Sequence, residues 1–286
     1  MTAELFTAEI LAVGSELLTP HRADTNSLYL TARLNEIGIE VRAKSIVGDN
    51  PSDLKAMFAQ ALERADVVLL TGGLGPTADD ITREAVADSL NLPLQEDPDI
   101  LASIRGRFAS RGVPMPAINH RQALVPRGAA IVPNVNGTAP GLWIDTQQHV
   151  VVLLPGPPRE LQAMFEALVQ PRLAERTGGR GVRRRVIKIT GRPESQVDEI
   201  AQPVYQGMAD WPIPVHTTIL AAPGQIELHL SARGPDLVAV DRVLDDAVQK
   251  LTAVLGDIVF SRDGRALAEV VGDLLRDRGK QIAVAE

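Results

Sequence analysis

The sequence of 286 residues contains no cysteine. Disulfide bonds, thiolate catalysis and Cys-ligated zinc are therefore excluded. Aromatic residues make up only 3% of the chain, so a hydrophobic core has to rely on alanine, valine, leucine and isoleucine. The length is sufficient for a sizeable core and indicates about two domains.

Long apolar runs and an excess of positive charge are also absent. The longest apolar runs, such as Val150–Leu154, are too short to span a bilayer. The chain begins Met-Thr-Ala-Glu without a basic or apolar leader, so we expect a cytoplasmic protein with no membrane partner. The net charge of -7 argues against nucleic acid as a direct partner. We interpret the basic run 183–185 as a solvated strand entry.

Apolar runs alternate with amphipathic helical patterns in the first half of the chain. The patterns predict strands at 9–13, 40–47, 66–70 and 150–154, and helices at 25–37, 51–64, 81–90 and after 158. The run at 66–70 is typical of a parallel strand buried on both faces. This βαβα order predicts a parallel sheet with helices on both of its faces.

The pattern changes after the glycine-rich stretch 177–181, which is the best linker candidate. Strands at 186–190, 216–221 and 225–232 and helices at 194–205 and 237–255 predict a small α+β unit. A helix at 266–278 and a strand beginning at 281–285 follow. Because one helix and one strand cannot bury a core, we expect the chain to be part of a longer protein.

The strongest chemical signal is the glycine-rich segment 71–80, which follows a buried strand and opens a helix. Its glycines allow tight turns and close approach of a ligand, and its N–H groups with the helix terminus predict an anion site. Asp79 and Asp80 follow, and paired carboxylates beside a phosphate site suggest a metal. One of them could instead cap the helix.

Polar residues follow the other predicted strands, where the carboxyl ends of a parallel sheet line a crevice. Asp49 is either a ligand or a helix cap, with Asn50 or Ser52 as the alternative cap. Glu16 is a metal ligand, a base or a cap, and Asn26 is a clamp on sugar or phosphate or a cap. Two further loops, 134–141 and 155–160, complete the candidate site, although Glu160 could equally be a surface charge.

These motifs in this order resemble the CinA family of competence- and damage-inducible proteins. The matching segments are 13–18, 71–80, 136–141 and 155–160, and the resemblance covers nearly the whole chain. Residues 1–176 are similar to the molybdenum-cofactor-biosynthesis domain. The resemblance therefore implies a MogA-like three-layer α/β/α sandwich with a mostly parallel sheet, followed by a small α+β domain.

The resemblance also implies an activity, namely metal-dependent hydrolysis of ADP-ribose to AMP and ribose 5-phosphate with Mg²⁺, Co²⁺ or Mn²⁺. Asp49 and Asp80 match the two aspartates associated with the active site in that superfamily, and Asp79 is a third catalytic candidate. Asp49, Asp80 and Glu16 are the expected metal ligands. The expected substrate-binding residues are Gly14, Glu16, Asn26, Thr71, Gly72, Gly73, Gly75, Thr77, Asn136, Gly137, Thr138, Pro155, Gly156 and Glu160.

Residues 182–259 resemble the KH-like domain of CinA proteins. Only one glycine of the nucleic-acid-binding Gly-x-x-Gly loop is present, at Gly191, so packing or dimerisation is the expected role. Residues 260–286 resemble the start of a nicotinamide-nucleotide amidase domain, but the chain stops at Glu286, before that domain's serine motif. Amidase activity would therefore belong to a longer parent protein.

Two other functions compete with hydrolysis. A molybdopterin-type ligand is disfavoured because Leu74 stands where pterin-binding members usually carry a hydroxyl residue. A non-catalytic partner of competence or DNA-repair proteins is the third reading. The resemblance further suggests a homodimer.

Overall fold

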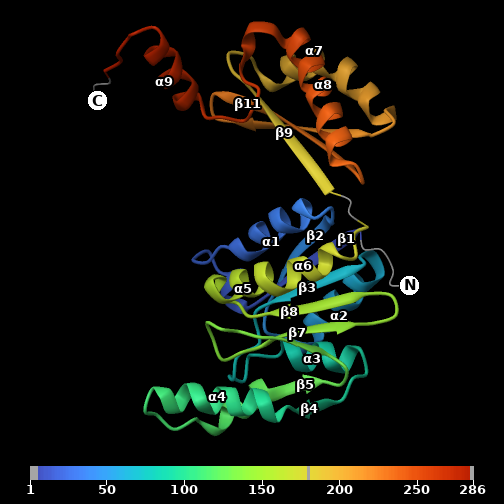
Figure 1. Cartoon of the computed structure of the whole chain (residues 1–286), viewed down its shortest axis with the longest axis vertical. Helices are drawn as coiled ribbons and strands as arrows, with labels where there is room; N and C mark the ends of the chain where they lie inside the picture. Colours follow the sequence, from blue (N-terminus) through green and yellow to red (C-terminus); the bar gives the residue numbers. More distant parts are fainter. Residues whose placement is uncertain (1–5, 179–180, 284–286) are drawn as a thin grey trace. The chain divides into compact units, whose positions relative to one another are not determined.

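The computed structural model describes residues 6–178 and 181–283 of the chain. It contains two compact units, Met1–Gly179 and Arg180–Glu286 (Figure 1). Residues 179 and 180, in the middle of the expected linker, lie outside the described residues, as do 284–286. Within the described parts, no helix combines the length and apolar character needed to cross a membrane.

The first unit is built on a six-stranded sheet in the order β2-β1-β3-β8-β7-β6. Strands β1, β2, β3 and β8 are parallel, while β7 and β6 pair antiparallel at one edge. A separate short pair joins β4 to β5. The strands are β1 (Thr7–Val13), β2 (Glu40–Val47), β3 (Val67–Thr71), β4 (Leu94–Glu96), β5 (Leu124–Pro126), β6 (Ala130–Val132), β7 (Gly141–Asp145) and β8 (Val150–Leu154).

Helices cover both faces of this sheet, so the expected α/β sandwich with a mostly parallel sheet is confirmed (Figure 1). The helices α1, α5 and α6 pack on one face, and α2 and α3 pack on the other. Bounds are α1 (Thr25–Glu36), α2 (Pro51–Arg64), α3 (Thr82–Ser89), α4 (Pro98–Ser110), α5 (Pro158–Met164), the π-helical turn η3 (Phe165–Val169) and α6 (Gln170–Ala174), with 3-10 turns η1 (Ser15–Leu18) and η2 (Ala117–Ala123).

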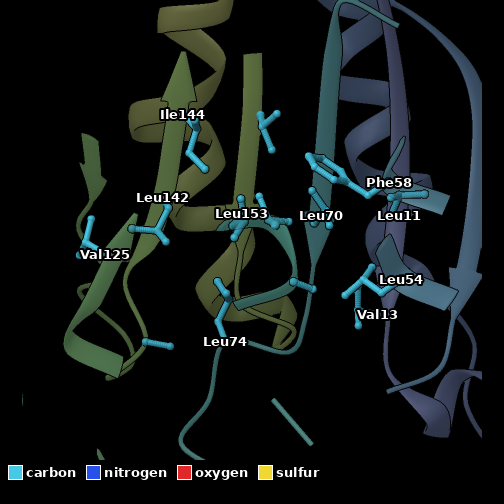
Figure 2. Packing of buried hydrophobic residues seen from close by; sticks show 14 of the residues in the cluster. Leu11, Val13, Leu54, Phe58, Leu70, Leu74, Val125, Leu142, Ile144 and Leu153 are labelled. Atoms are coloured by element: carbon cyan, nitrogen blue, oxygen red, sulfur yellow. The ribbon is translucent and has the colours of Figure 1, made fainter. Parts of the chain in front are cut away.

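The glycine-rich loop after β3 is anchored to the core on the α2–α3 side of the sheet. Leu74 is 1% exposed, and its side chain belongs to the cluster that contains Leu70 and Leu153. Figure 2 shows Leu70 and Leu153 on neighbouring strands and Leu74 beyond the ends of those strands. Leu74 also borders the crevice, so the argument from the missing hydroxyl stays a prediction.

The second unit has an antiparallel sheet in the order β10-β11-β9-β12, packed against α7 and α8. Arg185 bonds to Asp241 and Asp245 of α8, and Arg183 also pairs with Asp241, so two cations of the basic run are matched by acids. Bounds are β9 (Gly181–Ile189), α7 (Glu194–Tyr205), η4 (Gln206–Asp210), β10 (Val215–Ala222), β11 (Gln225–Gly234), α8 (Leu237–Leu255), η5 (Gly256–Ile258), β12 (Val259–Ser261) and α9 (Leu267–Asp277).

The tail after β12 differs in part from the expectation. Helix α9 forms close to its expected bounds, but residues 281–283 carry no regular structure and 284–286 lie outside the described residues. A strand needs a neighbour to satisfy its backbone groups, and nothing in the described part of the second unit pairs with this segment.

An ion pair between a buried glutamate and a half-exposed arginine joins β1 of the first unit to α2. Glu9 on β1 is 1% exposed, and the Arg64 guanidinium at the end of α2 bonds both of its carboxylate oxygens at 2.7 and 2.9 Å. Removing one partner of a buried pair leaves the other charge uncompensated, which is far more unfavourable than losing a surface pair.

We expect the substitution Arg64→Ala to lower the melting temperature of the protein clearly, because it leaves the Glu9 carboxylate buried without its partner. Circular dichroism during heating measures the effect. Arg42→Ala, at an exposed position of β2, is the control and should change the melting temperature little. Equal melting temperatures of the two variants would contradict the role assigned to the pair.

Candidate functional site

A crevice of about 710 Å³ lies at the carboxyl ends of β1, β2, β3 and β8, entirely within the first unit. Parallel strands end at one edge of their sheet, so segments far apart in sequence meet there. Most of the expected site residues line this crevice: Gly14, Glu16, Asn26, Asp49, Thr71, Gly72, Gly73, Gly75, Asp79, Asp80, Thr138, Pro155, Gly156 and Glu160. Thr77, Asn136 and Gly137 are not among the lining residues.

The loop after β3 turns its carbonyl groups back into the protein. The Gly72 carbonyl accepts from the Thr82 hydroxyl at 2.8 Å, and the Gly73 carbonyl accepts from the Thr82 N–H at 3.1 Å. The Leu74 carbonyl accepts from Arg83 at 2.9 Å. Gly72 and Gly73 have φ values of 93° and 65°, in the left-handed region that favours glycine.

The N–H groups of the same loop contrast with its carbonyls. Those of Gly73, Leu74 and Gly75 donate no hydrogen bond to any of the described residues. Gly73 and Gly75 are partly exposed and line the crevice. Consecutive N–H groups with their carbonyls turned away form a concave donor surface that suits anions such as phosphate.

The two aspartates after the glycine loop do not cap α3. One oxygen of Asp80 accepts from the N–H and the hydroxyl of Thr77, at 2.8 and 2.6 Å, and closes the turn. The helix begins after Ile81 without a side-chain cap, so the capping alternative is wrong for both residues. Hydrogen bonding by Thr77, and then by its own N–H, lowers the pKa of the exposed Asp79 below its ordinary value.

Asp49 links the loops after β1 and β2. Its carboxylate accepts from the Ser15 N–H at 2.8 Å, and its N–H donates to the Ser15 hydroxyl at 3.0 Å. The cap of α2 comes from Asn50, whose side chain accepts from Ser52 and Asp53. Asp49 is therefore not a helix cap, and its second carboxylate oxygen has no bond to the described residues.

Asn26 is likewise not a cap, since the Asp24 side chain caps α1 through the Ser27 N–H. The Asn26 amide donates to the Gly156 carbonyl at 2.8 Å and so connects α1 with the loop after β8. This bond fixes the edge of the crevice between two segments that are 130 residues apart.

The loop before β7 positions Glu160 in the crevice. The Asn134 side chain accepts from the N–H groups of Asn136 and Gly137 and donates to Glu160 at 2.6 Å. Asn136 itself donates to the Arg159 carbonyl at 3.1 Å, which places it outside the crevice as a loop anchor. Thr138 faces the crevice and accepts from Gln122 at 3.2 Å.

The charge of the lining is strongly acidic. Six carboxylates line the crevice, and Arg22 is the one cationic side chain among the lining residues that the structure describes. Sequence reasoning missed Arg22 and Gln122, and also Arg121, which bonds the Thr77 and Asp80 carbonyls from outside the crevice. Arg22 stands between two motifs that were recognised, whereas Gln122 and Arg121 carry no local signal.

The carboxylates of the crevice do not form a ready-made metal cage. No group of three or more His, Asp or Glu side chains positioned to hold a metal occurs in the described residues. Oxygen donors nevertheless suit Mg²⁺ or Mn²⁺, and Mg²⁺ is usually held by one or two carboxylates together with substrate phosphates and water. The residues therefore fit a metal that enters with a phosphorylated ligand, with Asp49, Asp80 and Glu16 as the candidate holders.

The family model of the probable molybdopterin binding domain matches residues 9–175. A CinA-like protein of Koribacter versatilis is 47% identical over 98% of this chain and 67% of its own length. A CinA-like protein of Acidobacterium capsulatum is 43% identical over the same shares of both chains. The structure of CinA from Thermoplasma acidophilum, described as having unknown function, matches with a TM-score of 0.54 and 32% identity, covering 58% of this chain and 98% of that one.

The first unit thus defines the class of molybdopterin-binding-type α/β domains. The chain belongs to the CinA family of competence- and damage-inducible proteins. It spans about two thirds of the length of the relatives that it matches.

We expect Gly73→Ala to disrupt the loop, because a Cβ there would overlap the Thr82 hydroxyl and the left-handed conformation alone costs about 1–2 kcal/mol. Thermal unfolding and isothermal titration with inorganic pyrophosphate in Mg²⁺ measure the two effects. Gly106→Ala is the matched control: nothing lies within 4 Å of its added Cβ, and alanine in a helix is favoured by about 0.5–1 kcal/mol. Unchanged pyrophosphate binding by Gly73→Ala would contradict the assignment of the loop.

Proposed function

We propose that the first unit is a metal-dependent ADP-ribose pyrophosphatase, which hydrolyses ADP-ribose to AMP and ribose 5-phosphate. The observation that carries the proposal is the pairing, in one crevice, of a donor loop with a wall of carboxylates. The loop amides suit phosphoryl oxygens, and the carboxylates suit a cation and the proton of an attacking water.

The acidity of the crevice supports a requirement for metal. A diphosphate is itself anionic, and six lining carboxylates with one arginine would repel it. A divalent cation removes this repulsion and, when bound, neutralises the diphosphate and orients water. The proposed ligand is therefore a metal-complexed diphosphate rather than the free anion.

The carboxylates have different roles in the proposed reaction. Asp79 is exposed at the crevice, and hydrogen bonding lowers its pKa and so favours its charged form, which suits charge compensation. Asp49 and Asp80 each use one oxygen to hold a loop, which fixes the carboxylate and leaves the other oxygen for water or cation. The amides of Gly73 and Gly75 stabilise charge that develops on the phosphoryl oxygens.

A pterin ligand is the second candidate, favoured by the match to the molybdopterin binding domain. Leu74, which packs in the core and also borders the crevice, offers no hydroxyl to this ligand. The relatives are named for competence and damage induction, which supports a partner role of the whole protein in those processes.

We expect phosphorus NMR to show AMP and ribose 5-phosphate appearing from ADP-ribose with Mg²⁺, Mn²⁺ or Co²⁺, and no turnover with EDTA. The physical reason is that the acidic crevice accepts a diphosphate only with a cation. Absence of turnover with every metal would overturn the hydrolase proposal. A thermal shift produced by pterin compounds in that case would favour the second candidate.

Asp80→Asn is expected to lower kcat roughly 100-fold or more, the range associated with loss of an acid–base or charge-stabilising group. Asparagine retains an oxygen that accepts from Thr77, so the turn survives and the charge alone is removed. Asp257→Asn, at an exposed position of the second unit, is the control and should retain the parent rate. Hydrolysis by Asp80→Asn at the parent rate would exclude Asp80 from the chemistry.

A further inference from the structure

A charged side chain lies buried directly behind the glycine loop. Arg83, at the start of α3, is 1% exposed and is among the largest fully buried side chains. It donates to the Leu74 carbonyl at 2.9 Å, while its other terminal nitrogen, Nη1, is buried without a hydrogen-bond partner in the described residues. Burial of an arginine that is only partly bonded is unfavourable, so its position calls for an explanation.

The nearest carboxylate compensates Arg83 only in part. Glu84 lies 3.9 Å from Arg83, beyond hydrogen-bonding distance, and the same oxygen accepts from Arg121 at 2.9 Å. We call these three residues the Arg83–Glu84–Arg121 cluster. Two cations share one anion, so the cluster carries a net charge of +1 behind the loop.

The cluster also holds the backbone of the loop. Arg83 bonds the Leu74 carbonyl, and Arg121 bonds the carbonyls of Thr77 and, at 3.0 Å, Asp80. In a trans peptide group the C=O and the N–H point in opposite directions. The N–H groups joined to these carbonyls therefore point away from the guanidinium groups. Positive charge behind the loop and N–H donors in front of it therefore act in the same direction on an anion in the crevice.

We propose that Arg83 is a positioning residue that sets the affinity of the glycine loop for a phosphoryl group. It orients the loop through the Leu74 carbonyl and supplies a buried positive charge that water does not screen. The inference rests on the proposed function, because it concerns the same anion site. The ligand class is any phosphate ester or diphosphate that reaches the loop amides.

Titration calorimetry in Mg²⁺ measures the binding of inorganic pyrophosphate to the whole chain and to its variants Arg83→Met, Arg83→Lys and Glu84→Gln. Arg83→Met removes both charge and donor and should raise Kd roughly tenfold. Arg83→Lys restores the charge and should recover most of that loss. Amide chemical shifts of Gly73 and Gly75 report whether the loop retains its geometry.

Glu84→Gln gives an effect of the opposite sign. Glutamine can still accept from Arg121, but the cluster gains positive charge, so pyrophosphate should bind more tightly than to the parent. This variant does not depend on Arg83→Met folding. Arg176→Met is the control, because Arg176 is also largely buried and paired, with Asp145 at 2.7 Å, but does not line the crevice.

Three results would each overturn the proposal. Arg83→Met could bind pyrophosphate as tightly as the parent protein, or Arg83→Lys could lose as much affinity as Arg83→Met. Glu84→Gln could also bind pyrophosphate more weakly than the parent. The predicted order of affinities without hydrolysis of ADP-ribose would overturn the proposed activity and leave the role of Arg83 intact. A parent protein that binds no pyrophosphate would overturn both.

Discussion

The functional geometry of the first unit depends on one constraint, which is the direction of the peptide groups after β3. Thr82, Arg83 and Arg121 bond the carbonyls of this loop, whereas the N–H groups of the crevice-lining Gly73 and Gly75 make no hydrogen bond to the described residues. The left-handed conformations at Gly72 and Gly73 make this direction accessible. If the peptides faced the other way, the loop would present acceptors beside carboxylates and repel phosphate.

Much of the fold and the location of the site could be predicted from local patterns. Helices over 51–64, 194–205 and 237–255 have the expected bounds, because each has apolar residues at helical spacing and a local start signal, namely the caps Asn50 and Asp236 for the first and third and Pro193 for the second. The crevice could be located because parallel strands end at one edge of the sheet, so that the residues following different strands lie close together. Asp49, Asp80 and Glu16 share that crevice for this reason.

The partners of those side chains could not be predicted, because they depend on contacts between distant segments. Ser15 and Asp49 are 34 residues apart, and Arg121 meets Asp80 from a distance of 41 residues in a loop with no motif. Leu74 has the same limit. It packs in the core cluster and also borders the crevice, and sequence position alone does not reveal either contact.

The crevice differs from a simple anion site in having donors and carboxylates on adjoining walls. A donor loop alone would bind any phosphate, and an acidic wall alone would bind any hard cation. Together they favour a ligand that carries both a phosphate and a cation. The phosphate binds the donor loop, and the cation binds the carboxylates that would otherwise repel the phosphate. The positive charge at Arg83 adds to the donor wall without occupying the crevice, since the side chain lies behind the loop. In this proposal the cationic and anionic groups act from separate walls of one crevice, and the unfavourable burial of Arg83 is retained for its effect on the ligand rather than for the stability of the fold.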